Sequence, residues 1–385
     1  MTQWYVDGVN GNNGNNGTTP ALAKATLTAV EALALAAGDT VNVRPTVYRE
    51  TLTTSHNGSA GNPITYLVDE GGAIFGVRGK ARITGSDNDA TITRASAIVC
   101  ANNFRVFRGF HVHATSTQGV YLNNCTNCEV DRCTFTDHIG TLVVVDGATQ
   151  SNHLIHRCKM WCVKFGGVSF SHTVTLNNTG HITENCDIIA TNAGSTSAIS
   201  TARVAGLTVR NCNILGGVRG VQVATALAGG QSINVNNCQF AGLNICFAAT
   251  IAGEIIENFN NLFGNYTDRS NTNVGANSVS KPPLWQTNLL TLGNTVLIPE
   301  DYDPLSAFIS IAGTGVAADD IYGTTRLNPS SWGSYQYVQG ALPVDAGTGF
   351  MIKVDDIGKV TIVGAINPST QAAIITAVQQ ALKGH

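Results

Sequence analysis

Apolar and polar residues alternate along the middle of the chain in short phrases that return about every 25 residues. Each phrase holds an apolar residue, two polar residues, a cysteine, one further residue and a second apolar residue, with five copies centred on Cys133, Cys158, Cys186, Cys212 and Cys238. A sixth, degenerate copy has Phe259 in place of the cysteine. The period-two alternation on both sides of the cysteine predicts two short strands that meet at a bend. Self-similarity at a fixed period predicts stacked repeats.

The segments between these phrases are short, rich in β-forming residues and introduced by glycine, as at 140–145 and 166–170. None has the i, i+3, i+4 spacing of an amphipathic helix. A unit of about 25 strand-forming residues cannot bury its apolar face alone, so it has to stack on its neighbours. The sequence therefore predicts an all-β fold, a right-handed single-stranded parallel β-helix over residues 41–280. About nine coils would give a rod on the order of 45 Å long, at about 4.8 Å per coil.

The repeated cysteines stand at one position of the coil. This predicts a buried structural ladder of small apolar side chains formed by Cys133, Cys158, Cys186, Cys212 and Cys238. Disulfides between coils are disfavoured, because thiols that leave parallel strands in the same direction are poorly oriented for an S–S bond. Cys125-x-x-Cys128, with Cys133 nearby, suggests a metal site, but no second ligand pair follows at zinc-finger spacing. We therefore expect packed thiols and no metal.

Composition and charge indicate which kinds of partner the chain is expected to have. Charged residues make up 12% of the 385 residues, the formal net charge is −3, and glycine occurs 41 times. Such a chain has no basic footprint, so a nucleic acid is not an expected partner. The first residues show neither the basic nor the apolar region of a secretory signal. No apolar run has the length of a membrane span, so we expect no membrane insertion.

The N-terminal residues 1–40 differ from the repeats. They predict a strand near Trp4, an Asn/Gly-rich loop over 10–17, and a helix from Thr19 to Ala37 that ends at Gly38. The candidate inner positions of this helix are Leu22, Leu27, Val30, Leu33 and Ala37. Because a β-helix exposes an apolar end, we expect the helix to cap it.

The C-terminal part also departs from the repeats. Residues 281–340 contain proline-rich loops and are expected to close the β-helix. Residues 350–354 and 360–363 predict a pair of strands, and Ser369 is expected to cap a last helix with an apolar side. This appended element at 341–385 is expected to serve attachment or oligomerisation, with a homotrimer favoured.

Motifs of a known family stand in the N-terminal third. The stretch Gly38-Asp-Thr-Val-Asn-Val-Arg-Pro45 leads to Tyr48-Arg-Glu50, and Gly61-Asn-Pro-Ile-Thr-Tyr66 follows. Over residues 4–76 this order resembles the opening of right-handed parallel β-helix proteins of the pectate-lyase-like superfamily. Residues 319–326 and 332–337 resemble the C-terminal signature of that family, with Trp332-Gly-Ser334 where aspartate, isoleucine and glycine are more usual. The resemblance implies a fold, whereas an activity depends on the site.

Enzymes of the family it resembles gather acids, bases or calcium ligands on one exposed strand face. The substrate-binding candidates in this chain are Asp131, Asp187, Arg210 and Trp161. Outward positions of a β-helix have to be polar in any case, so these residues do not define a catalytic set. The polygalacturonase branch implies Asn-Thr-Asp, Asp-Asp, Gly-His-Gly and Arg-Ile-Lys motifs, and the repeats have Asn178-Thr-Gly-His181 and no Asp-Asp pair. Histidines scattered over strands are expected at the surface. We therefore assign no catalytic residue.

Three functions are compatible with these observations. The rigid rod, the low charge, the reduced cysteines and the appended tail favour a structural virion surface protein of a phage, such as a capsid decoration, a head fibre or a tail spike. It would assemble in the host cytoplasm with capsid or tail proteins as partners, and would bind host polysaccharide as a further ligand. The alternative is a polysaccharide-degrading lyase or glycoside hydrolase, with Ca²⁺ as a cofactor only for a lyase. The third function is a non-catalytic glycan-binding β-helix.

Overall fold

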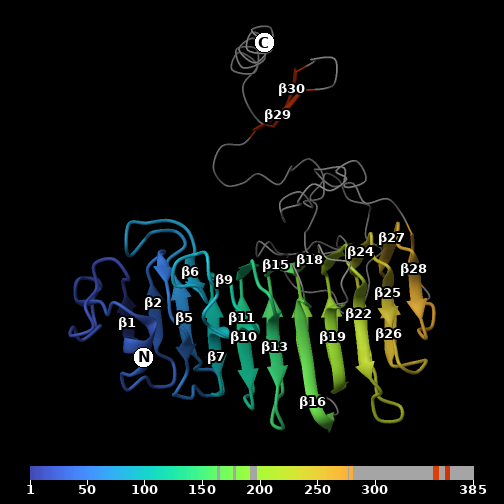
Figure 1. The fold of residues 1–385 in the computed structure, drawn as a ribbon, viewed down its shortest axis with the longest axis horizontal. Coiled ribbons are helices and arrows are strands. Elements are labelled where there is room, and N and C mark those ends of the chain that lie inside the picture. Colours follow the sequence, from blue (N-terminus) through green and yellow to red (C-terminus); the bar gives the residue numbers. More distant parts are fainter. Residues whose placement is uncertain are drawn as a thin grey trace.

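Three parallel sheets run along one rod (Figure 1), which we call sheets A, B and C. The computed structural model describes residues 1–280, except 163–164, 177–178, 191–196 and 276, together with the backbone of 350–354 and 360–364. From β2 onward, each coil of the rod contributes one strand to each sheet, so strands three apart in the chain are hydrogen-bonded neighbours, and β1 pairs with β2 at the N-terminal end. All strand pairs within these sheets are parallel, as in Val130 opposite Ile155. This confirms the predicted parallel β-helix of about nine coils.

The strands of each sheet follow one another in chain order along the rod. Sheet A consists of β1 (Gln3–Val6), β2 (Thr40–Val43), β5 (Ile64–Val68), β8 (Arg105–Arg108), β11 (Glu129–Asp131), β14 (Leu154–His156), β17 (Ile182–Glu184), β20 (Thr208–Arg210), β23 (Ile233–Asn236) and β26 (Ile255–Asn258). Sheet B consists of β3 (Val47–Tyr48), β6 (Ala81–Thr84), β9 (Phe110–His113), β12 (Thr134–Thr136), β15 (Lys159–Cys162), β18 (Asp187–Ala190), β21 (Asn213–Leu215), β24 (Gln239–Ala241) and β27 (Asn261–Phe263). Sheet C consists of β4 (Leu52–Thr53), β7 (Ser96–Cys100), β10 (Gln118–Asn123), β13 (Thr141–Asp146), β16 (Val168–Leu176), β19 (Ser197–Val204), β22 (Arg219–Thr225), β25 (Ile245–Ala248) and β28 (Thr267–Ser270).

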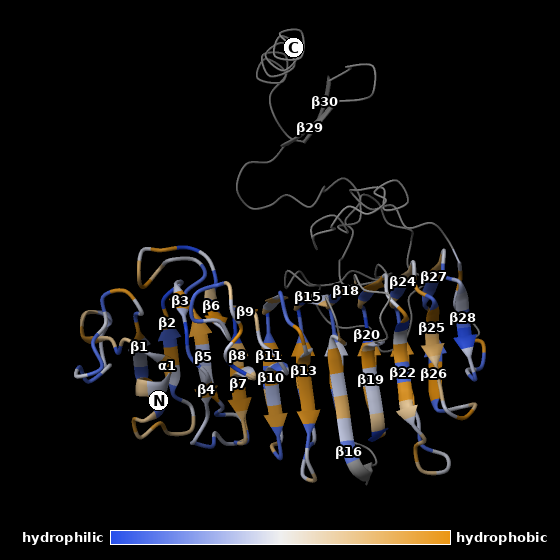
Figure 2. Ribbon diagram, viewed as in Figure 1, coloured by the Kyte–Doolittle hydropathy of each residue, from blue (hydrophilic) through white to orange (hydrophobic). Residues whose placement is uncertain are grey.

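The apolar residues that alternate along the strands meet inside the rod. In β5, for example, Ile64, Tyr66 and Val68 are buried while the residues between them are partly exposed. Figure 2 shows the resulting bands of hydrophobic residues on the strands. One continuous core cluster extends from Val6 to Leu262. The period-two pattern of the sequence therefore decides which side chains enter the core.

A tight corner joins each strand of sheet A to the following strand of sheet B. At this corner Asn185, Asn211 and Asn237 have φ values of +52°, +53° and +57°. Asparagine tolerates the left-handed region better than most residues, which explains its return at this point of the repeat.

The cysteine that follows each corner points into the core. The five repeated cysteines are buried, and none of the ten cysteines of the chain forms a disulfide. Each repeated thiol donates to the carbonyl oxygen two residues before it, as in Cys158 to His156 and Cys186 to Glu184, both at 3.2 Å. The thiol thereby satisfies a carbonyl at the bend while its sulfur packs in the core.

The helix predicted from Thr19 to Ala37 is wrong in its extent. The structure has a 3₁₀ turn at Pro20–Leu22 and an α-helix, α1, of five residues at Leu27–Glu31. Thr26 rather than Thr19 caps the α-helix, accepting from the backbone N–H of Ala29 at 3.1 Å. The predicted inner residue Leu22 is 43% exposed. Residues before α1 form backbone hydrogen bonds with β1, as in Lys24 N–H to the carbonyl of Tyr5, and are therefore not part of the helix.

The expectation that the histidines lie at the surface is also wrong for four of them. His156 is 7% exposed, and His138, His153 and His181 are each no more than 1% exposed. In each of the latter three, a ring nitrogen contacts a backbone group of a neighbouring coil, as in His138 Nε2, which donates to the carbonyl of Val112 at 2.9 Å. The desolvation cost of burying a neutral ring is reduced here because the neighbouring coils supply backbone hydrogen-bond partners inside the rod.

Two further strands follow the rod in the sequence. β29 (Phe350–Val354) and β30 (Val360–Gly364) pair antiparallel, at the residues where the sequence predicts two strands. The predicted closing segment at 281–340 and the predicted last helix lie outside the described residues. Within the described part of the chain, no helix has the length and hydrophobicity needed to cross a membrane.

Candidate functional site

Charged side chains gather at one coil position of sheet A, directly before the corner. Strand pairing places Asp131 opposite Arg108 on one side and His156 on the other. It also places Glu184 between His156 and Arg210. We call Arg108, Asp131, His156, Glu184 and Arg210 the charged ladder. Five neighbouring coils thus supply a row of ionisable groups along the rod.

The corner residues of two of these coils add further arginines. Arg132 and Arg157 have φ values of +51° and +52°, at the position where other coils have asparagine. An arginine in the left-handed region costs on the order of 1 kcal/mol, because its Cβ crowds the following carbonyl. Side chains retained at such a cost are candidates for a role other than turn formation.

Asp131 is the fully buried centre of the ladder. Arg157 donates to both of its carboxylate oxygens, from Nε at 2.7 Å and from Nη2 at 2.8 Å. Arg108 Nε lies 2.5 Å from Oδ2 of the same carboxylate. Two guanidinium groups thus surround this buried carboxylate, and the two parallel bonds from Arg157 fix its orientation.

Glu129 and His156 form a second pair beside Asp131. His156 Nε2 lies 3.0 Å from Oε1 of Glu129, and Arg108 Nη2 donates to the same oxygen at 2.9 Å. Burial raises the pKa of Glu129, but the hydrogen bond and charge of His156 and the charge of Arg108 outweigh it and lower the pKa to about 2. Burial lowers the pKa of His156, whereas Glu129 and Asp131 raise it above its ordinary value. The pair therefore favours an imidazolium next to a carboxylate.

The far end of the ladder continues the same alternation of charge. Arg210 Nε donates to Oε2 of Glu184 at 2.6 Å. Oε1 of Glu184 lies 4.0 Å from Nδ1 of His156. At the near end, Arg132 Nη2 lies 3.3 Å from Glu70, which also binds Lys80 at 2.8 Å. Acidic and basic side chains therefore alternate along the charged ladder.

A metal ion does not fit these residues. Ligand atoms of Glu129, Asp131 and His156 lie within 4.8 Å of one another. Two guanidinium groups already occupy the carboxylate oxygens of Asp131, however. A divalent cation would have to displace these groups and sit beside their charges, so the donor set is unsuited to Ca²⁺.

The residues predicted from the sequence are divided between two sheets. Asp131 and Arg210 belong to the charged ladder. Asp187 lies on sheet B, where it is fully buried and accepts a hydrogen bond from Asn213 Nδ2 at 2.9 Å. Trp161, also on sheet B, pairs with Ile189 and is partly exposed. The structure therefore does not bring Asp131 and Asp187 together as ligands of one ion.

Sequence reasoning missed Arg108, Glu129 and Arg157. Arg108 stands two residues before Phe110, as Asp131 stands two residues before Cys133. The repeat phrase extends one coil further towards the N-terminus if Phe110 is accepted in the cysteine position. That alignment was the signal that would have placed Arg108 in the row.

The outer face of sheet C contrasts with the charged ladder. One register row across five of its strands is uncharged and half-buried, and comprises Tyr121, Val144, Ser169, Ser200 and Gln222. This row contains no carboxylate, histidine, lysine or arginine, so it offers no charged group for catalysis. The charged ladder is therefore the stronger candidate for a functional site.

Comparisons with known proteins show the fold. No protein-family model matches the chain, and no curated protein matches it. Among solved structures, it is similar to a pectate lyase, Pel9A, with a TM-score of 0.57 and 13% identity over 88% of this chain and 97% of that chain. It is also similar to XylC in complex with xylose, with a TM-score of 0.56 and 11% identity over 74% and 70% of the two chains. A rhamnogalacturonan lyase matches with a TM-score of 0.52 and 16% identity over 68% and 74%. The fold is thus a right-handed parallel β-helix similar to that of pectate lyase and related polysaccharide-active enzymes.

Proposed function

We propose that the protein is a polysaccharide-binding β-helix that holds an acidic polysaccharide along its charged ladder. The observation that carries the proposal is the layering of charge. The side chain of Asp131 is fully buried, and that of Glu184 is 10% exposed. The side chains of Arg108 and Arg132 are 32% and 43% exposed. The carboxylates of Asp131 and Glu184 therefore lie beneath the more exposed guanidinium groups of Arg108 and Arg132. Glu129, at 23%, and Arg157, at 18%, have intermediate exposure.

This layering suits a chain of repeated anionic groups. Guanidinium groups bind carboxylates and sulfates through two parallel N–H donors, so a partly exposed arginine retains donors for a ligand. Neighbouring coils are about 4.8 Å apart, so Arg108, Arg132 and Arg157, which belong to three successive coils, offer binding positions at short intervals along the rod. A flexible acidic polysaccharide laid lengthwise would meet several of them at once.

Binding is proposed rather than cleavage, because the acidic and basic side chains in and beside the charged ladder are poorly suited to catalysis. The pKa of Glu129 is held at about 2, so this carboxyl is ionised at neutral pH and has no proton to give to a leaving group. His156 is only 7% exposed. The polysaccharide-active enzymes with a similar fold support carbohydrate as the ligand class, since the elongated surface of this fold suits a polymer.

Binding of defined polysaccharides tests the proposal. We expect the purified full chain to bind polygalacturonate or alginate but not neutral dextran, and the affinity to fall as salt is raised. Replacement of Arg132 by glutamine should weaken binding roughly 3- to 10-fold, as expected for an exposed charge pair. The matched control is Arg94→Gln, because Arg94 is a partly exposed arginine paired with Asp87 away from the ladder. Equal binding by wild type and Arg132→Gln would contradict the proposal.

The same samples distinguish binding from degradation. Release of unsaturated uronate ends from the polysaccharide would identify a lyase, and release of reducing ends without unsaturation would identify a hydrolase. Either result would replace the binding function proposed above.

A role on a phage virion stays a prediction, as do the homotrimer and the attachment function of residues 341–385. The comparisons bear only on the fold. Mass spectrometry of virions from the source, together with sizing of the recombinant chain, would test this role directly.

A further inference from the structure

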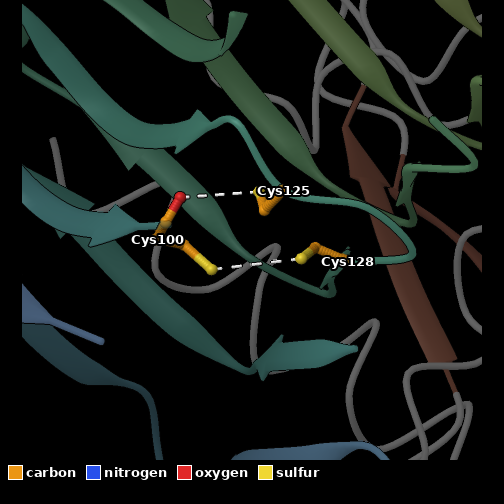
Figure 3. Close-up of side chains that lie close together, drawn as sticks. All are labelled: Cys100, Cys125 and Cys128. Carbon is orange, nitrogen blue, oxygen red and sulfur yellow. Dashed lines mark hydrogen bonds between the residues drawn. The ribbon is translucent and has the colours of Figure 1, made fainter. Parts of the chain in front are cut away.

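Three cysteines from two neighbouring coils meet inside the rod, away from the charged ladder. Cys100 ends β7, and Cys125 and Cys128 lie in the turn between β10 and β11. All three are buried, and their sulfur atoms lie within 4.8 Å of one another. Figure 3 shows the sulfur atoms of Cys100 and Cys128 directed toward each other, at 3.9 Å. We call these residues the thiol trio.

The spacing of the thiol trio is close to that of a metal ion with three sulfur ligands, with one sulfur pair at the ideal distance and all three atoms within 4.8 Å. Metal–sulfur bonds of about 2.3 Å in a trigonal plane place the sulfur atoms about 4.0 Å apart. The Cys100–Cys128 distance of 3.9 Å already has this value. A disulfide would require the same atoms to approach to about 2.05 Å and would leave the third thiol unused.

The coil repeat does not impose cysteine at these positions. Strand pairing places Leu122 opposite Cys100, and Val145 follows in the next coil. The equivalents of Cys128 in the next two coils are His153 and His181, each of which accepts the backbone N–H of its predecessor at 3.2 Å. The trio thus differs from the row of five repeated cysteines, where one coil position recurs.

The next coil fixes the turn that carries two of the thiols. His153 Nε2 donates to the carbonyl of Cys125 at 3.0 Å, while its Nδ1 accepts the N–H of Cys128 at 3.2 Å. These two bonds determine the tautomer of the ring and hold the loop from both ends. Metal ligands that are oriented by their surroundings need little reorganisation on binding.

The surroundings of the trio indicate which metal would fit. Thiolates are soft ligands that select Cu(I), Zn²⁺ or iron–sulfur clusters. A structural Zn²⁺ site needs four ligands, and both nitrogens of His153 are already engaged by the backbone. Three sulfur atoms without a fourth ligand suit Cu(I).

We propose that Cys100, Cys125 and Cys128 bind one Cu(I) ion through three sulfur atoms. Three Cu–S bonds form, three thiol protons leave to solvent, and the oxidation state of the metal does not change. Because the trio is buried, the ion has to enter during folding or through local opening of the turn. The proposal is independent of polysaccharide binding, which uses the outer surface of sheet A.

Titration with Cu(I) under reducing, oxygen-free conditions tests the proposal. The full chain, both as purified and after refolding from denaturant, would compete with a coloured Cu(I) chelator for the ion. We expect one Cu(I) per chain, with three sulfur neighbours in X-ray absorption spectra. Cys125→Ala should lower the affinity at least 10-fold, and Cys128→Ala provides the same test should the first variant fail to fold.

The matched control is Cys212→Ala, which removes a buried thiol from the row of repeated cysteines. Unchanged Cu(I) affinity in this variant supports the trio as the binding site. An equal loss in Cys212→Ala would overturn the proposal, because the ion would then bind the row. Absence of tight Cu(I) binding, or a Cys100–Cys128 disulfide in chain purified without reductant, would overturn it as well.

Discussion

A buried ion pair ties the N-terminal helix to the first coils of the rod. Arg105, in β8, is fully buried, and its Nη2 donates to Oε2 of Glu31 in α1 at 2.7 Å. Tyr66 donates its hydroxyl to the same oxygen at 2.6 Å, and Arg105 Nη1 donates to the carbonyl of His56 at 2.8 Å. The pair joins residues 74 positions apart in the sequence. Its removal is the most direct test of how α1 is held.

Replacement of Arg105 by methionine keeps much of the side-chain volume but leaves Glu31 buried without its counter-charge. Removing one partner of a buried ion pair costs about 3–5 kcal/mol, mostly through the desolvated charge that remains. The loss should be local, because in a stacked-repeat protein each coil depends chiefly on its neighbours. We therefore expect protection of the α1 amides against hydrogen exchange to fall by roughly 150- to 5,000-fold, with little change beyond β11.

The cost of Arg105→Met should depend on pH. Burial raises the pKa of Glu31, but Arg105 and the hydroxyl of Tyr66 outweigh it and lower the pKa below 4.5. The wild-type pair therefore stabilises the fold above pH 4.5, and this contribution is lost as the pH falls through the folded-state pKa. In the variant, burial acts without Arg105 and favours the neutral acid. The difference between variant and wild type should thus be larger at pH 7 than at pH 4.

Hydrogen exchange followed by mass spectrometry at both pH values provides the measurement. The control is the double variant Glu31→Leu with Arg105→Met, which should recover most of the lost protection, because apolar replacement of a whole buried pair is often nearly neutral. A loss below about 1 kcal/mol for Arg105→Met, or a loss of equal size at both pH values, would refute the reasoning.

Three further predictions concern the corners and the core. Arg132→Asn should raise the stability by up to about 1 kcal/mol in urea unfolding, because asparagine tolerates the φ of +51° there, while polysaccharide binding weakens. Gly140→Ala should destabilise by about 1–3 kcal/mol in the same assay, since the added Cβ would lie 1.8 Å from the carbonyl oxygen of Thr117. Burial lowers the pKa of His138 from 6.5 to about 4, so the unfolded chain binds its proton first and stability falls as the pH drops from 6.5 towards 4. In urea unfolding at a series of pH values, His138→Gln should reduce this dependence by roughly 3 kcal/mol, and an unchanged pH profile would contradict the assignment.

The sequence alone determined the coil and much of the ladder. The cysteine phrase sets the period, the corner and the inward side, because a strand alternates its faces strictly. Asp131, His156, Glu184 and Arg210 each stand two residues before a repeated cysteine, so their common row follows from the repeat. Stacking of equivalent corners then places these four side chains side by side.

Tertiary structure decided the features that depend on turns of unequal length. Cys100 and Cys128 occupy different positions of their coils, and only the path of the turn between sheets C and A brings their sulfur atoms to 3.9 Å. Burial of His138 depends likewise on a carbonyl supplied by another coil. A periodic sequence specifies which residues share a row, because register is repeated. Contacts between different rows depend on the path of each turn, and this path is determined only when the coils pack on one another.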